Sequence, residues 1–98
     1  MSEPLAAVRA VVRGRVQGIG FRDYVLNRAS FLGLTGYVRN LPDGRSVEVV
    51  AEGARPDLEQ LLDYLREGPR MSRIEAVDAE WRDATDAYDG FGVGLTRS

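Results

Sequence analysis

The chain reads Gly14-Arg15-Val16-Gln17-Gly18-Ile19-Gly20-Phe21-Arg22 at the point where an alternating, strand-like run gives way to a helix-like run. Three glycines within seven positions indicate a tightly folded loop, because glycine accepts positive φ angles and lets a bound group approach the backbone. A loop that opens into a helix also directs several N–H groups the same way, which favours an anion. Arg22 adds a planar, permanently charged fork suited to phosphate. The stretch predicts a phosphate-binding loop, although a loop that only turns the chain has a similar composition.

The residue types that are missing limit the possible chemistry. The chain has no Lys, so the loop is not a P-loop, and its Gly-x-x-x-Gly-x-Gly spacing is not the dinucleotide fingerprint. Without His or Cys, the chain lacks the nucleophilic machinery built on those residues, and a zinc site would need carboxylates alone. We therefore expect no metal and no cofactor. Any catalysis has to come from positioning, electrostatics or carboxylates.

Length and composition favour one small globular domain over residues 1–98. The 98 residues are 44% hydrophobic and 29% charged, with no apolar run long enough to span a membrane and no signal-peptide pattern at the start. We expect a cytoplasmic monomer. Residues 1–50 carry seven Arg against four acidic residues, which suits an anionic ligand near the loop, although ordinary scatter of surface charge is equally consistent. The acidic overall balance, a net charge of −2, disfavours a nucleic-acid partner.

Hydrophobic periodicity predicts six main elements. Alternation predicts strands over 6–13, 34–40, 45–52 and 73–82, although the inward face of the last is ambiguous. Helical spacing predicts helices over 21–32 and 56–67, and Phe91, Val93 and Leu95 suggest a short fifth strand. The order β-α-β-β-α-β is typical of an α+β, ferredoxin-like sandwich, with a mainly antiparallel sheet and two helices on one face.

This topology brings two polar side chains together. If the strand over 45–52 lies between the strands over 6–13 and 34–40, the outer two run parallel and end at the same edge of the sheet. The loop follows the first of them, and Asn40 ends the second. We therefore expect Arg22 and Asn40 to converge. Taken singly, Arg22 is also consistent with a solvated helix residue, and Asn40 with the start of the turn before Pro42.

Two stretches of the sequence, the loop and the segment around Asn40, resemble the two signatures of the acylphosphatase family. The first is Gly14 to Arg22, with Ile19 at a position where the family usually has Val. The second is Gly36-Tyr37-Val38-Arg39-Asn40, followed by Leu41-Pro42-Asp43-Gly44-Arg45-Ser46-Val47 and ending at Gly53. The resemblance extends over roughly residues 6–95 and has both signatures in the expected order.

The resemblance implies metal-free hydrolysis of the carboxyl-phosphate bond in small acyl phosphates. It implies that Asn40 orients the attacking water and that Arg22 binds the phosphoryl group together with backbone N–H groups of the loop. The loop residues concerned are Arg15, Val16, Gln17, Gly18, Ile19, Gly20 and Phe21. The residues themselves fit that division of labour, because phosphoryl transfer depends on positioning and charge stabilisation, and a carboxylate leaves without protonation. Judged by residue type alone, Gln17 is expected to be held by contacts with the backbone. Phe21 and Tyr37 are expected to pack against other side chains.

Two other functions remain as alternatives. An RNA-recognition module shares the element order, but its base-stacking strands would present Arg9, Val11, Arg13, Ser46, Glu48 and Val50 here, with no aromatic residue and with Glu48 repelling the backbone. The second alternative is a phosphate sensor without hydrolysis, or a domain for carbamoyl phosphate chemistry in hydrogenase maturation. Binding without turnover would favour the sensor.

Overall fold

The structure, a computed structural model, describes residues 4–94 and contains the helices and strands in the predicted order. The predicted ends of the first six elements lie within two residues of the observed ones. Leu95, assigned to the fifth strand by its pattern, lies outside the described residues. The elements are β1 (Leu5–Arg15), α1 (Phe21–Phe31), β2 (Thr35–Asn40), β3 (Ser46–Ala54), α2 (Arg55–Glu67), β4 (Arg73–Asp83) and β5 (Phe91–Val93).

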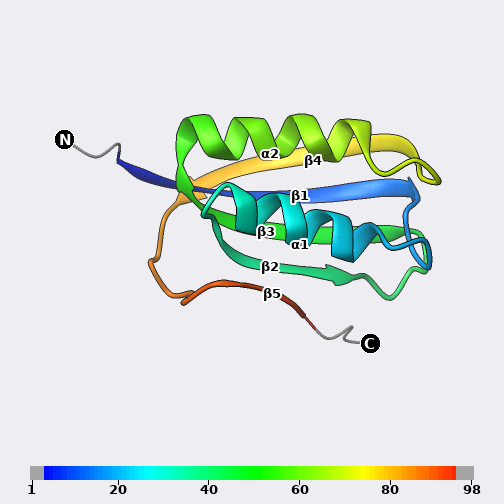
Figure 1. Cartoon of the computed structure of the whole chain (residues 1–98), viewed down its shortest axis with the longest axis horizontal. Coiled ribbons are helices and arrows are strands. Elements are labelled where there is room, and N and C mark those ends of the chain that lie inside the picture. Colours follow the sequence, from blue (N-terminus) through cyan, green and yellow to red (C-terminus); the bar gives the residue numbers. More distant parts are fainter. Residues whose placement is uncertain (1–3, 95–98) are drawn as a thin grey trace.

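The strands form a single sheet in the order β4-β1-β3-β2-β5, and both helices cover one face of it (Figure 1). β3 pairs antiparallel with both β1 and β2, so β1 and β2 run parallel and end at the same edge, as the sequence predicts. β5 adds to the far side of β2 in parallel. This is the expected ferredoxin-like α+β sandwich. Within residues 4–94, neither helix combines the length and apolar character needed to cross a membrane.

The core lies between the helices and the sheet, on the faces that the periodicity predicts. Val8, Ala10 and Val12 of β1 face the leucine stripe of α2 across the layer, and all of these side chains are buried. α1 contributes Phe21 and Val25, which are 1% and 0% exposed. Phe21 is thus anchored in the core at the first position of α1. That anchor fixes where the preceding loop meets the sheet.

A β-bulge explains why the inward face of β4 is ambiguous in the sequence. β4 pairs with β1 so that Val77 lies opposite Val12, but the register shifts at Gly14, which lies opposite Ile74. Ile74 and Val77 both pack against the core although they are three residues apart, so strict alternation fails. Gly14 has a φ of 136°, and a Cβ there would lie 2.0 Å from the carbonyl oxygen of Arg73. Only glycine therefore fits at this close approach between the backbones of β1 and β4.

Glu48 lies on the open face of the sheet, at the outward position that the alternation predicts, but its carboxylate is buried and paired rather than free to repel a nucleic-acid backbone. Glu48 is 4% exposed and accepts hydrogen bonds from Nε of Arg9 at 2.6 Å, Nε of Arg39 at 2.6 Å and the Tyr37 hydroxyl at 3.1 Å. The interaction therefore ties β1, β3 and β2 together. Burial alone would raise the pKa of Glu48, but the hydrogen bonds from Arg39, Arg9 and Tyr37 outweigh burial and hold it below its ordinary value of 4.5.

We expect Glu48→Gln to lower the free energy of unfolding near pH 7 by about 2 kcal/mol, because charge-assisted hydrogen bonds are lost. Since the folded pKa is depressed, the ionised carboxylate stabilises the fold fully above its ordinary value of 4.5, and that contribution is lost as the pH falls through the folded pKa. Urea unfolding near pH 7 and about pH 3 checks this. A gap between wild type and variant that stays constant on acidification would contradict it.

Candidate functional site

The loop between β1 and α1 is built to leave backbone donors unpaired. Gly18 and Gly20 have φ angles of 75° and 79°, and Gly20 caps α1 in the left-handed conformation. The first helical bond runs from the N–H of Tyr24 to the carbonyl of Gly20 at 3.0 Å, so the earlier N–H groups of the first turn have no partner within the helix. Among residues 4–94, none accepts a hydrogen bond from the N–H groups of residues 17–20. These donors are available to an anion.

Gln17 fastens the loop to the neighbouring β2–β3 turn. Its Nε2 donates to the carbonyl oxygens of Leu41 at 3.0 Å and Ser46 at 2.8 Å. This confirms the prediction that Gln17 is held by backbone contacts. Because Leu41 directly follows Asn40, this contact holds the loop after β1 and the carboxyl end of β2 at the same edge of the sheet, at the right of Figure 1.

A pocket of about 280 Å³ opens at the start of α1, and Arg22 is one of the residues that line it. Arg22 is half-buried, and within residues 4–94 it makes no hydrogen bond or ion pair. Five of the residues predicted for phosphate binding line the pocket, and two others, Asp23 and Val93, line it without having been predicted. The predicted members are Val16, Gly18, Gly20, Phe21 and Arg22.

Three predicted loop residues lie outside the pocket wall. Arg15 is the last residue of β1, where it pairs with Arg73 and is exposed. Gln17 points to the turn instead, and Ile19 packs against the core. Their side chains therefore hold the loop or face solvent. Phe21, at 1% exposed, confirms the prediction of packing, and Tyr37 packs near Tyr88 with its hydroxyl on Glu48.

Asn40 has an amide whose oxygen lacks a partner. Its Oδ1 is buried and accepts no hydrogen bond from any residue of the 4–94 range, and its side chain makes none as a donor either. A buried polar atom left without a partner costs about 1–3 kcal/mol, so such atoms are rare in folded proteins. Asn40 lies on the helix-facing side of β2, two residues beyond the buried Val38. The amide therefore faces the layer that contains the loop.

The turn after Asn40 is ordered by Asp43. Its carboxylate accepts the Ser46 hydroxyl at 2.6 Å and the N–H groups of Arg45 and Ser46, each at 2.9 Å. The Ser46 hydroxyl, with these N–H groups, holds the pKa of Asp43 below its ordinary value of 3.8. The turn keeps the end of β2 in place beside the loop.

β5 reaches the pocket because a second buried carboxylate fixes the segment that leads to it. Glu52 of β3 accepts the Thr85 hydroxyl at 2.8 Å and the N–H groups of Thr85 and Asp86, the latter at 2.8 Å. β5 then pairs with β2 so that Val93 lies beside Val38. No local pattern in the sequence identifies this long-range pairing, which is why Val93 was missed. Asp23 was missed because a first-turn acid is ordinary in helices.

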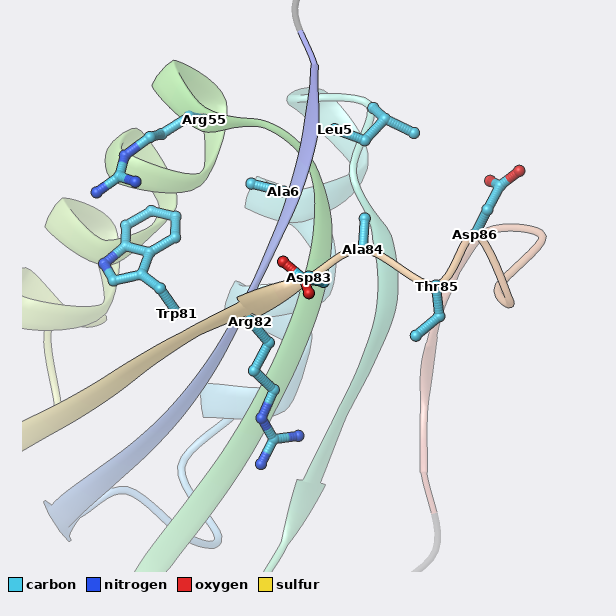
Figure 2. Close-up of a pocket in the computed structure, with 9 residues that line it drawn as sticks. All are labelled: Leu5, Ala6, Arg55, Trp81, Arg82, Asp83, Ala84, Thr85 and Asp86. Atoms are coloured by element: carbon cyan, nitrogen blue, oxygen red, sulfur yellow. The ribbon is translucent and has the colours of Figure 1, made fainter.

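A larger hollow, of about 780 Å³, lies at the other end of β1 (Figure 2). It is wide open to solvent, and its lining includes Leu5 and Ala6 of β1. Arg55 also lines it and stacks on Trp81, with its Cζ 4.0 Å from the centroid of the indole ring. The lining of the hollow includes no residue of the loop, and Asn40 lines neither this hollow nor the smaller pocket. Size alone therefore does not make it the functional site.

The fold and the loop define a small α+β domain with an arginine-lined pocket at the start of a helix. The family model described as Acylphosphatase matches residues 8–93. An acylphosphatase of Thermus thermophilus is 56% identical over 84 residues, which cover 86% of this chain and 93% of the relative. This chain belongs to the acylphosphatase family, and it is an enzyme of the hydrolase class.

Two solved structures show how far the similarity extends. The structure of an acylphosphatase from Coxiella burnetii is similar with a TM-score of 0.87 and 36% identity, covering 93% of this chain and 94% of that one. Full-length HypF, solved in a phosphate- and nucleotide-bound form, matches with a TM-score of 0.88 and 26% identity, covering 98% of this chain but 13% of HypF. The fold is thus shared with a small hydrolase and with one part of a much larger protein.

Proposed function

We propose that this chain hydrolyses the carboxyl-phosphate bond of small acyl phosphates without a metal ion, acting over residues 1–98 as a single domain. The observation that carries the proposal is the loop whose unpaired N–H groups, in residues 17–20, adjoin the pocket of Arg22. Membership in the acylphosphatase family supports the reaction. The working form is a cytoplasmic monomer with no nucleic-acid partner, in keeping with the composition and net charge of −2.

The phosphoryl group binds through its equatorial oxygens. Backbone N–H groups from Arg15 to Phe21 and the Arg22 guanidinium donate to these oxygens. Each charge-assisted hydrogen bond contributes roughly 1.5–3 kcal/mol, and the start of α1 adds the favourable end of the helix dipole. Because the donors are held by the fold before the substrate arrives, they stabilise the transition state without reorganisation.

Asn40 holds the attacking water. Its amide has an oxygen that accepts and an NH₂ that donates, so it fixes a water in line with the breaking bond without acting as a strong base. The water oxygen attacks phosphorus, the bond from phosphorus to the carboxyl oxygen breaks, and its electron pair leaves on the carboxylate. Both protons of the water remain on the phosphate, so the products are a carboxylate and H₂PO₄⁻. No protonated leaving group is required.

Hydrolysis of benzoyl phosphate by the purified protein in excess EDTA tests the proposal. We expect rapid release of phosphate that added divalent metals do not increase. A folded protein that binds inorganic phosphate without turning over benzoyl phosphate would overturn the hydrolase proposal and favour a sensor.

A domain for carbamoyl phosphate chemistry, the alternative raised by the sequence, is the second candidate, and the match to one part of HypF shows that this fold also occurs inside a much larger protein. The two candidates differ in substrate rather than in mechanism. Measuring kcat/KM for carbamoyl phosphate beside benzoyl phosphate separates them, because a carbamoyl-specific domain would prefer the former.

The loop glycines provide a direct test of the backbone donors. We expect Gly20→Ala to weaken inorganic phosphate binding about tenfold, since a side chain disfavours the left-handed conformation and turns the neighbouring N–H groups away. Gly33→Ala is the matched control, because Gly33 has a φ of 72° at the end of α1 and, like Gly20, open space around its Cβ position. Both variants should lose about 1 kcal/mol of unfolding free energy. Isothermal titration with phosphate would contradict the loop's role if the two variants bound alike.

A further inference from the structure

The pocket at the start of α1 has a charged wall and an apolar wall. Arg22 and the loop glycines form the first, and Val93 of β5 forms the second. Val93 is 46% exposed, whereas the other apolar side chains of the pocket, Val16 and Phe21, are each 1% exposed. Val93 is thus the apolar side chain of this pocket that a ligand can touch.

The position of Val93 follows from its strand pairing. It lies beside Val38 on the helix-facing side of the sheet, and β5 is the edge strand, so Val93 stays partly uncovered where Val38 is fully buried. The N–H of Gly94 donates to the Val38 carbonyl at 2.7 Å, and the N–H of Gly36 donates to the Gly90 carbonyl at 3.0 Å. Both ends of the short strand are therefore fixed, and the valine is held at the pocket.

Asp23 places a negative charge at the same opening. It is exposed, and within residues 4–94 it forms no ion pair or hydrogen bond that would neutralise it. A carboxylate here opposes any further negative charge on a ligand whose phosphoryl group already occupies the loop.

We propose that Val93 and Asp23 select the acyl half of the substrate, so that the enzyme prefers acyl phosphates with an uncharged, apolar acyl group over those whose acyl group carries a second anion. The inference rests on the proposed function. With the phosphoryl group at the loop and Arg22, the acyl group extends across Val93, and a carboxylate on it meets the field of Asp23.

Three probes test the two contacts: acetyl phosphate, benzoyl phosphate and 4-carboxybenzoyl phosphate. In Val93→Thr, which keeps the branched shape but replaces a methyl by a hydroxyl, we expect the benzoyl-to-acetyl ratio of kcat/KM to fall about threefold, with acetyl phosphate changed less than about twofold. In Asp23→Asn, we expect the 4-carboxybenzoyl-to-benzoyl ratio to rise about threefold at low ionic strength and to approach the wild-type value in about 0.5 M salt. Asp83→Asn is the matched control, because it removes an exposed carboxylate at the far end of β1.

The outcomes separate the inference from the function on which it rests. An unchanged benzoyl-to-acetyl ratio in Val93→Thr would overturn the apolar contact. An equal response of Asp23→Asn and Asp83→Asn would overturn the local charge effect, since net charge alone would then account for it. If the folded wild type hydrolysed none of the three probes, the proposed function itself would fall. Circular dichroism confirms that each variant is folded.

Discussion

Arg22→Lys is expected to lower kcat/KM for benzoyl phosphate by about 10²-fold or more while the protein stays folded. The guanidinium offers several donors in a fixed plane that match two phosphoryl oxygens at once, whereas the ammonium of lysine is a single point charge on a flexible stem. Arg22 makes no hydrogen bond or ion pair with any other residue between 4 and 94, so its replacement removes no interaction of the fold seen there. Stability should therefore change by less than about 0.5 kcal/mol.

Arg66→Lys is a suitable control, since Arg66 is an exposed helix arginine with a surface ion pair to Asp63 at 3.3 Å. It should retain wild-type turnover. Steady-state kinetics and urea unfolding of both variants provide the comparison. Near-normal turnover by Arg22→Lys would remove the guanidinium from the mechanism. Equal losses of turnover in the two variants would show that the effect does not depend on the position of the arginine in the pocket.

Much of the fold is predictable because its signals are local. The leucines of α2 repeat at helical spacing and are buried as predicted, and Gly33, with a φ of 72°, ends α1 as its sequence position indicates. The face of β4 was not predictable, because its bulge depends on how Gly14 meets the backbone of a strand about sixty residues later in the chain. Long-range register leaves no trace in the periodicity of a single strand.

The residues of the candidate site also fall into those that have a local signal in the sequence and those that depend on long-range pairing. Arg22 and the loop glycines follow from local composition, and Asn40 follows from the inference that β1 and β2 end at one edge. The position of Val93 depends on the pairing of β5 with β2, and the segment that leads to β5 is held at Thr85 by the buried carboxylate of Glu52. Burial of a glutamate cannot be read from a strand pattern in which it occupies an outward position. For this reason the outward position of Glu48 is predictable, whereas its burial and its pairing with two arginines are not.

Asn40→Ala is expected to lower kcat about 10²-fold and to leave the KM for benzoyl phosphate and the inhibition by inorganic phosphate within about threefold of wild type. A water that is positioned for attack matters mainly in the transition state, whereas the ground-state phosphoryl contacts come from the loop and Arg22. Steady-state kinetics with phosphate as the inhibitor separates the two effects. A rise in KM with kcat unchanged would contradict the water-orienting role.

Stability provides an independent criterion for Asn40. A structural asparagine would lose hydrogen bonds on truncation, but this side chain makes none to a residue in the 4–94 range and buries an unpartnered Oδ1. We therefore expect Asn40→Ala to keep or raise the free energy of unfolding, since removal of an unsatisfied buried group relieves a cost of about 1–3 kcal/mol. Asn27→Ala, at the chain's other asparagine, which is exposed on α1, should leave kcat unchanged. Loss of activity without loss of stability is the result that a water-holding amide requires, and a destabilised Asn40→Ala would instead assign the residue to the architecture of the turn.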